Sequence, residues 1–307
     1  MKRRRFVISG LAAAAAPRLF AQTPAPSQAP PLVIEMDVEV VSVTAVIFDK
    51  AGRFVKGLTS LDVELLEDGV KQDLSYFREA VGGDEKIPLS VALVLDCSGS
   101  MKNNMHFMQQ AATSFVRKLE DVDKALVISF NESIKGSAEF TDDTDRLEQF
   151  VDGLQPWGGT SLYDAINYGL GRVRDQSGRK ALVVFTDGDD TTSRSTSQEV
   201  IDYARGIEAT IYTVGIGSAS SGFLKKVSGE TGGESFFPNK VADLIKVFAQ
   251  IAEELRQQYG LAYSPKKSAD NTYRAIQLRV TTRKDVEVRV RKGYYAMKRR
   301  KPAKPRP

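Results

Sequence analysis

Three oxygen-bearing motifs have residue types and spacings suited to binding a divalent cation. The first follows an apolar run that ends at Asp96, with Ser98 and Ser100 at the next alternate positions. Such a run is typical of a parallel strand covered on both faces, and open α/β sheets bind ligands beyond the carboxyl ends of their strands. Carboxylate and hydroxyl oxygens favour Mg²⁺ or Ca²⁺ over soft metals. The alternative is an ordinary turn in which a serine caps the next helix.

Two later stretches are expected at the same edge of the sheet. A glycine-rich loop, Gly158 to Ser161, leads into a helix, and Thr186-Asp187-Gly188 follows an apolar strand. Because the carboxyl ends of parallel strands share one edge, both stretches are expected near Asp96. Taken alone, the first is also compatible with a helix cap and the second with a simple turn.

The elements that must position these motifs alternate between strands and helices from Ile87 to about Gln257. Strands are expected at 91–95, 125–130, 181–186 and 210–214, and amphipathic helices at 104–120, 145–154, 162–174, 197–208 and 241–255. This alternation predicts right-handed crossovers and a parallel sheet. A further run at 134–140, which follows a short turn, is expected as an antiparallel edge strand.

In this order and spacing, the three motifs resemble the von Willebrand factor A domain and its metal-ion-dependent adhesion site. The resemblance implies one Mg²⁺, or alternatively Mn²⁺ or Ca²⁺, held by Asp96, Ser98, Ser100, Thr160 and Asp187. It also implies a protein partner that offers an Asp or Glu side chain to the cation. This ligand set is physically sensible because two carboxylates roughly neutralise the cation while the hydroxyls add no charge.

Residues beside these motifs refine the expectation. In integrin-type β subunits, which carry a similar domain, acidic residues of an adjacent metal site follow the serine motif. This sequence has Asn103 and Asn104 at those positions, so a second cation is not expected. Asp189 and Asp190 are interpreted as residues at the rim of the site or at the start of a helix. Cys97 is interpreted as a small core residue rather than a reactive thiol.

The two ends of the chain are rich in β-type sequence. Strands are expected at 33–48, 63–66 and 73–77, with a hairpin signal at Glu67-Asp68-Gly69, and again at 259–263, 273–281, 286–290 and 293–295. Three strands are marginal alone, so the two sets are predicted to form one small β-sandwich, as in the exported bacterial proteins that the chain resembles. The alternative is two independent β appendages. The predicted fold class is α/β, with a Rossmann-like doubly wound, mostly parallel sheet inserted in that sandwich.

The predicted division of the chain begins with an export signal. Lys2 to Arg5 precede a short apolar stretch and a cleavage signal near Ala21, which is typical of a bacterial signal peptide and implies a periplasmic or extracellular location. Arg3 to Val7 also resembles a twin-arginine motif, with a Sec signal as the alternative. The expected parts are the signal at 1–21, a linker at 22–31, the N-terminal half of the sandwich at 32–82, the von Willebrand A-like domain at 86–257, the C-terminal half of the sandwich at 258–297 and a basic disordered tail at 298–307.

Charge and composition exclude several function classes. The formal net charge is +4, yet residues 1–21 carry five positive charges and residues 298–307 carry six, so the body between them is acidic. This argues against a nucleic-acid-binding core. The tail is interpreted as a solvated end, with weak contact to anionic surfaces as the alternative. One cysteine and one histidine exclude an internal disulfide and most histidine-based catalysis, and no later stretch suits a membrane span.

Two function classes remain after these exclusions. The first is a binding module that grips a protein partner through the cation. The alternative is a Mg²⁺-dependent hydrolase of the haloacid dehalogenase phosphatase type, which also places an Asp after a hydrophobic strand. That chemistry needs a second Asp two positions later for acid and base work, and position 98 is a serine. The chain is therefore predicted not to be an enzyme, and no catalytic residues are expected.

Overall fold

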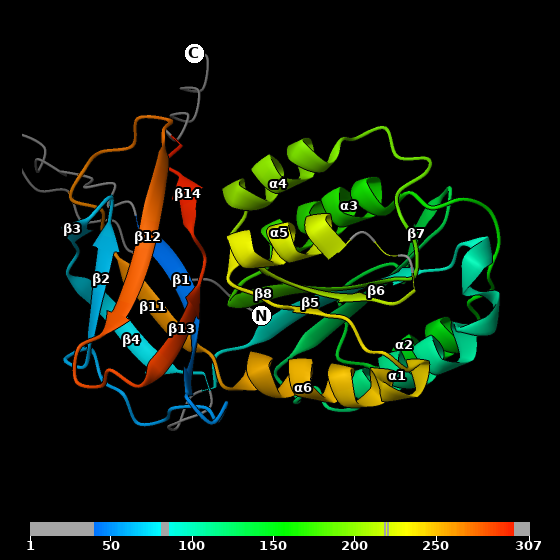
Figure 1. Ribbon diagram of the computed structural model, residues 1–307, viewed down its shortest axis with the longest axis horizontal. Helices are drawn as coiled ribbons and strands as arrows, with labels where there is room; N and C mark the ends of the chain where they lie inside the picture. The colour runs from blue at the N-terminus through cyan, green and yellow to red at the C-terminus, as the bar shows by residue number, and fades with distance from the viewer. Residues whose placement is uncertain (1–39, 81–85, 218, 220, 298–307) are drawn as a thin grey trace, which may run out of the picture. The chain divides into compact units, whose positions relative to one another are not determined.

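The computed structural model describes residues 40–80, 86–217, 219 and 221–297 (Figure 1). The expected signal peptide, the linker, the start of the first expected strand and the basic tail lie outside the described residues. The described strands form one six-stranded sheet and two four-stranded sheets. Of the helices described, none combines the length and apolarity needed to cross a bilayer.

The six-stranded sheet carries the motifs at one edge. Its order is β10-β9-β8-β5-β6-β7, and all neighbours are parallel except β7, which runs antiparallel to β6. The strands are β5 (Leu89–Asp96), β6 (Lys124–Phe130), β7 (Ile134–Gly136), β8 (Arg179–Thr186), β9 (Thr210–Gly215) and β10 (Ser235–Phe236). All eight residues of β5 are buried, because it is central and both its faces are covered.

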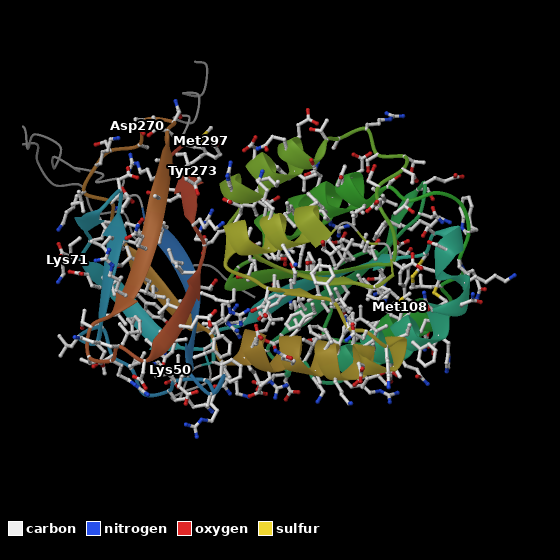
Figure 2. The ribbon with its side chains drawn as sticks, in the orientation of Figure 1. Lys50, Lys71, Met108, Asp270, Tyr273 and Met297 are labelled. Atoms are coloured by element: carbon white, nitrogen blue, oxygen red, sulfur yellow. The ribbon has the colours of Figure 1, made fainter. Side chains whose placement is uncertain are left out.

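Helices cover both faces of this sheet (Figure 1). One face packs against α1 (Met105–Val116), α2 (Thr144–Asp152) and α6 (Leu244–Arg256), and the other against α3 (Leu162–Arg174), α4 (Ser197–Gly206) and α5 (Ser221–Thr231). Short 3₁₀ helices, η1 (Gly99–Asn103) and η2 (Val241–Asp243), precede α1 and α6. Met108 of α1, labelled in Figure 2, is fully buried between this helix layer and the sheet. The predicted doubly wound α/β class is thus confirmed.

Three helix predictions need correction. No helix is predicted over α5, because its glycines Gly222 and Gly229 weaken the helical signal and few apolar residues mark its inner face. The helix expected at 241–255 is divided, with a 3₁₀ turn over its first three residues and the α-helix from Leu244 onward. The first expected helix also ends earlier, at Val116.

The two four-stranded sheets combine strands from both ends of the chain. One has the order β13 (Val286–Val290), β1 (Val41–Asp49), β11 (Tyr259–Tyr263) and β4 (Leu74–Glu79), and the other β14 (Gly293–Tyr295), β12 (Tyr273–Val280), β2 (Val63–Glu67) and β3 (Val70–Lys71). Their inner faces share one apolar core. Neither end of the chain supplies a complete sheet, so the alternative of two independent appendages is wrong.

The expected hairpin is correct in its turn but wrong in its second strand. Asp68 and Gly69 both have positive φ, 49° and 80°, as a two-residue hairpin turn requires. The turn joins β2 to the two-residue β3, whereas β4 pairs with β11 in the other sheet. The chain changes sheets at Gln72, whose side chain is buried.

A buried ion pair joins the two ends inside the sandwich. Arg274 of β12 is fully buried, and its Nη1 donates to Glu67 Oε1 of β2 at 3.0 Å. The other oxygen, Glu67 Oε2, accepts hydrogen bonds from the hydroxyls of Tyr263 at 2.6 Å and Tyr294 at 2.9 Å. These contacts compensate the buried charges of Arg274 and Glu67, which would destabilise the fold if they were buried without partners.

Candidate functional site

The carboxyl ends of β5 and β8 bring three predicted site residues into contact. Ser98 Oγ and Ser100 Oγ lie 3.0 Å apart in the loop after β5. Ser100 Oγ donates to Asp187 Oδ1, just beyond β8, at 2.6 Å. This chain of hydrogen bonds joins side chains that are 87 positions apart in sequence. The parallel pairing of β5 with β8 is what places them side by side.

Asp96 is the last residue of β5, directly before this loop, and is fully buried. Its Oδ1 accepts from the backbone N–H of Ser98 at 2.8 Å, and its Oδ2 accepts from Thr186 Oγ1 at 2.6 Å. Burial raises the pKa of Asp96, the bonds from Thr186 and Ser98 oppose that shift, and the charge of Asp187 adds to it. Two carboxylates close enough to repel each other form an electrostatic environment that a bound cation would relieve.

Thr160 is brought to the same edge by its loop. Trp157 N–H donates to the carbonyl of Cys97 at 2.9 Å, and Gly99 N–H donates to the carbonyl of Gly158 at 3.0 Å. On its other side, Thr160 N–H donates to Thr191 Oγ1 at 2.9 Å. Thr160 is 5% exposed. The glycine-rich loop therefore lies against the serine loop, as the sequence predicted.

The serines are not used as helix caps. Ser98 precedes η1 and Ser161 precedes α3, yet neither side chain makes a capping hydrogen bond. Asp190 takes that role for α3, because its Oδ2 accepts from Tyr163 N–H at 3.0 Å. Asp190 therefore caps a helix that precedes it in the chain, whereas Thr196 caps the helix that follows it. The helix-cap alternative for the serine loop is contradicted.

Two residues that were not predicted to contact the ligands hydrogen-bond to them. Thr186 holds Asp96, and the signal for it was a hydroxyl residue at the end of an apolar strand, directly before Asp187. Asn104 donates through Nδ2 to Asp187 Oδ2 at 3.3 Å. The Asn104 amide thus orients a carboxylate that is a predicted ligand.

The donor set fits a hard cation. Within residues 40–80, 86–217, 219 and 221–297, no group of three or more His, Cys, Asp or Glu side chains is placed to hold a metal ion. The five predicted ligands instead combine two carboxylates with three hydroxyls, which are hard oxygen donors. Burial raises the pKa of the Cys97 thiol to about 12, and its side chain packs in the apolar core, as expected for a small core residue.

The chain is similar in sequence to a known domain family and to curated proteins. The model of the von Willebrand factor type A domain matches residues 90–250. Human calcium-activated chloride channel regulator 4 is 29% identical over 174 residues, which are 52% of this chain and 18% of that protein. The chain spans less than half the length of the curated relatives that it matches.

Solved structures resemble the chain in fold. A von Willebrand factor type A structure from Catenulispora acidiphila has a TM-score of 0.52 and 13% identity, and the match covers 82% of this chain and 71% of that one. Proximal thread matrix protein 1 from the mussel byssus, with a zinc-occupied MIDAS motif, has a TM-score of 0.51 and 18% identity over 58% of this chain and 48% of that one. Both likenesses support the α/β fold described above.

Proposed function

The chain belongs to the von Willebrand factor type A domain family, and on that premise we propose that it is a cation-dependent binding module for a protein partner. The proposed cation ligands are Asp96, Ser98, Ser100, Thr160 and Asp187. The observation that carries the proposal is the hydrogen-bonded chain from Ser98 through Ser100 to Asp187. It gathers oxygens from two strand ends at one point, and the capping alternative does not account for the serine loop.

Each residue has a defined part in this proposal. Asp96 and Asp187 supply the negative charge, and the three hydroxyls supply neutral oxygens. Thr186 and the Ser98 N–H fix the orientation of the Asp96 carboxylate. The bound cation would supply a Lewis-acidic position for a carboxylate of the partner. The zinc-occupied motif of the mussel protein supports a divalent ion, and the all-oxygen donor set favours Mg²⁺, Mn²⁺ or Ca²⁺.

We propose that the sandwich supports the binding domain, residues 86–257, through contacts with the C-terminal end of α6. Arg289 of β13 donates to Glu254 Oε2 of α6 at 2.6 Å and also pairs with Glu234. Arg179 at the start of β8 donates to the carbonyl of Leu255 at the end of α6. These contacts tie α6 to its surroundings at the end of the sheet opposite the candidate site.

We also propose that the protein is exported from the cytoplasm. The basic and apolar pattern of residues 1–21 supports export, with a periplasmic or extracellular site of action. A module that binds its partner through a cation would then encounter that partner outside the cytoplasm. The partner is proposed to offer an Asp or Glu side chain.

Replacing Thr186 by Val is expected to weaken Mn²⁺ binding about 10-fold or more, because the buried Asp96 carboxylate loses the hydroxyl that orients it. Mn²⁺ affinity is measured by competition with a chelating dye. Thr210→Val is the matched control, since Thr210 is a buried strand threonine whose hydroxyl contacts Thr44 rather than the site. Equal affinities of the two variants would contradict a role for Thr186.

We further propose that the chain does not catalyse phosphate hydrolysis. Ser98 stands where a haloacid dehalogenase phosphatase needs its second Asp, and its hydroxyl contacts Ser100. With Mg²⁺ and a general phosphomonoester, wild type and Asp96→Ala are expected to release phosphate at the same background rate. A rate above background that disappears in Asp96→Ala would support the phosphatase alternative instead.

A further inference from the structure

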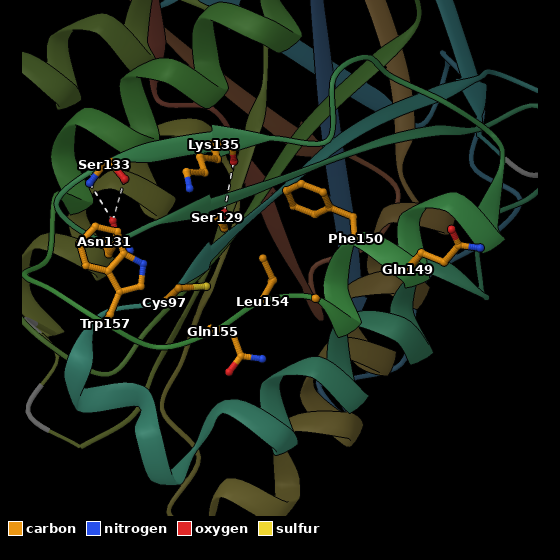
Figure 3. Close-up of a pocket in the computed structure, with 11 residues that line it drawn as sticks. Cys97, Ser129, Asn131, Ser133, Lys135, Gln149, Phe150, Leu154, Gln155 and Trp157 are labelled. Carbon is orange, nitrogen blue, oxygen red and sulfur yellow. Dashed lines mark hydrogen bonds between the residues drawn. The ribbon is translucent and has the colours of Figure 1, made fainter.

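A cavity of about 400 Å³ opens beside the candidate cation site (Figure 3). We call it the Lys135 pocket. In the view of Figure 3, Trp157 and Phe150 stand on opposite sides of it, Lys135 lies above, and Cys97 and Leu154 lie below. Its lining comes from the ends of β5 and β6, from β7, from α2 and from the loop that carries Thr160.

The strand register explains why the core opens here. Leu95 of β5 pairs with Ser129 of β6, which pairs with Lys135 of β7. On the same face of β6, the earlier residues Ala125 and Val127 lie in the apolar core under α1 and α2. At Ser129 a small polar side chain replaces an apolar one, so the space beyond the end of α2 is left open.

The pocket and the candidate site share a wall. Cys97 lines the pocket and lies between Asp96 and Ser98 in sequence. Its carbonyl accepts the N–H of Trp157, a residue that is 48% exposed and also lines the pocket. A short extended segment bound at the site would therefore have its neighbouring side chains at the mouth of the pocket, since consecutive residues advance about 3.3 Å.

The lining carries one charge. Lys135 is the only charged residue among those that line the pocket, and its ammonium group makes no hydrogen bond or ion pair with any described residue. Three of the other polar side chains there are already engaged, as Ser133 Oγ contacts Asn131 Oδ1 at 3.0 Å and Ser129 Oγ donates to the Lys135 carbonyl at 3.4 Å, whereas the amides of Gln149 and Gln155 are neutral lining groups. An uncompensated cation beside apolar walls favours a ligand with an apolar stem and an anionic end.

We propose that the Lys135 pocket receives a second acidic side chain, a glutamate, from the same partner segment whose first carboxylate reaches the cation. This rests on the proposed function. The walls formed by Phe150, Leu154 and Trp157 cover the methylene groups of the glutamate, and Lys135 pairs with its carboxylate. The partner is thus recognised by two acids at a fixed separation rather than by one.

A displayed library of random ten-residue peptides tests this proposal. The library is selected on the full chain in Mg²⁺, and bound clones are released with EDTA. Clones from wild type are expected to share one invariant acid and a Glu at a fixed spacing from it. Clones from Lys135→Gln are expected to keep the invariant acid and lose the spaced Glu. Lys124→Gln, an exposed lysine at the opposite end of β6, is the matched control and should behave as wild type.

The outcomes separate the two proposals. EDTA-released clones with one invariant acid but no spaced Glu, or with a spaced Glu that survives Lys135→Gln, would overturn the pocket while leaving the proposed function intact. An absence of EDTA-released clones would overturn the proposed function and the pocket with it. Circular dichroism spectra that match wild type verify that each variant is folded.

A double-mutant cycle on one selected peptide gives the size of the effect. Changing the spaced Glu to Gln is expected to weaken binding about two- to fivefold, the range for a solvent-accessible ion pair. The same change should have no effect on binding to Lys135→Gln, because the ion pair is already absent. Additive losses in the cycle would show that the two groups do not interact.

Discussion

Asp96→Ala is expected to lower Mn²⁺ affinity at least about 100-fold, because the change removes a buried charge at the centre of the donor set. Asp96 is also the residue that ends the central strand, so no neighbouring carboxylate takes its position. The measurement is competition with a chelating dye, backed by thermal unfolding. A 100-fold excess of Mn²⁺ over its Kd stabilises a binding-competent fold by about 2.7 kcal/mol. That stabilisation should be lost in the variant.

Asp189→Ala is the matched control for this prediction. Asp189 is exposed and lies two residues after Asp187. Its removal takes away the same charge from the same edge of the sheet without touching the proposed ligands. An equal loss of Mn²⁺ affinity in both variants would show that the effect is one of general charge. Unchanged affinity in Asp96→Ala would contradict the site.

Arg274→Met is expected to destabilise the fold by about 3 to 5 kcal/mol, because it leaves the buried Glu67 carboxylate without its cation. The hydroxyls of Tyr263 and Tyr294 still donate to Glu67 but carry no charge. Arg274 also donates to the carbonyl of Lys267 at 2.7 Å, so the turn before β12 loses a partner as well. The free energy of unfolding is measured by urea titration followed by tyrosine fluorescence.

Arg279→Met tests the same change of residue type on the same strand. Arg279 is exposed and its guanidinium contacts only the neighbouring Gln277 among the interactions described. Its replacement should shift the urea midpoint little, within about 0.5 kcal/mol. Similar losses in both variants would mean that the buried pair with Glu67 contributes nothing specific to stability.

Much of this structure follows from local sequence patterns. The apolar run before Asp96 predicted a buried central strand, and the helix expected at 162–174 has those bounds in the structure. The strands at 259–263 and 286–290 also match, because alternating and β-branched residues bounded by turns mark them clearly. The motifs at Asp96 and Asp187 share one sheet edge because parallel strands place their carboxyl ends together, and backbone hydrogen bonds hold the Thr160 loop against the first of them.

Other features depend on contacts that no local pattern reports. The pairing of β4 with β11 joins residues about 180 positions apart. The local turn at Asp68 and Gly69 therefore gives no indication that β4 belongs to a different sheet from β2. The Lys135 pocket arises from the register of three strands, of which β7 is only three residues long. The role of Thr186 became visible only when β8 was placed beside β5.

Anomalous diffraction from crystals grown with Mn²⁺ tests the central claim most directly. We expect one strong Mn²⁺ peak per chain. The ion should be coordinated, directly or through water, by oxygens of Asp96, Ser98, Ser100, Thr160 and Asp187. We also expect a carboxylate or water at the position left open to a partner. A map with no peak at this edge of the sheet, or with the ion held by other residues, would contradict the account.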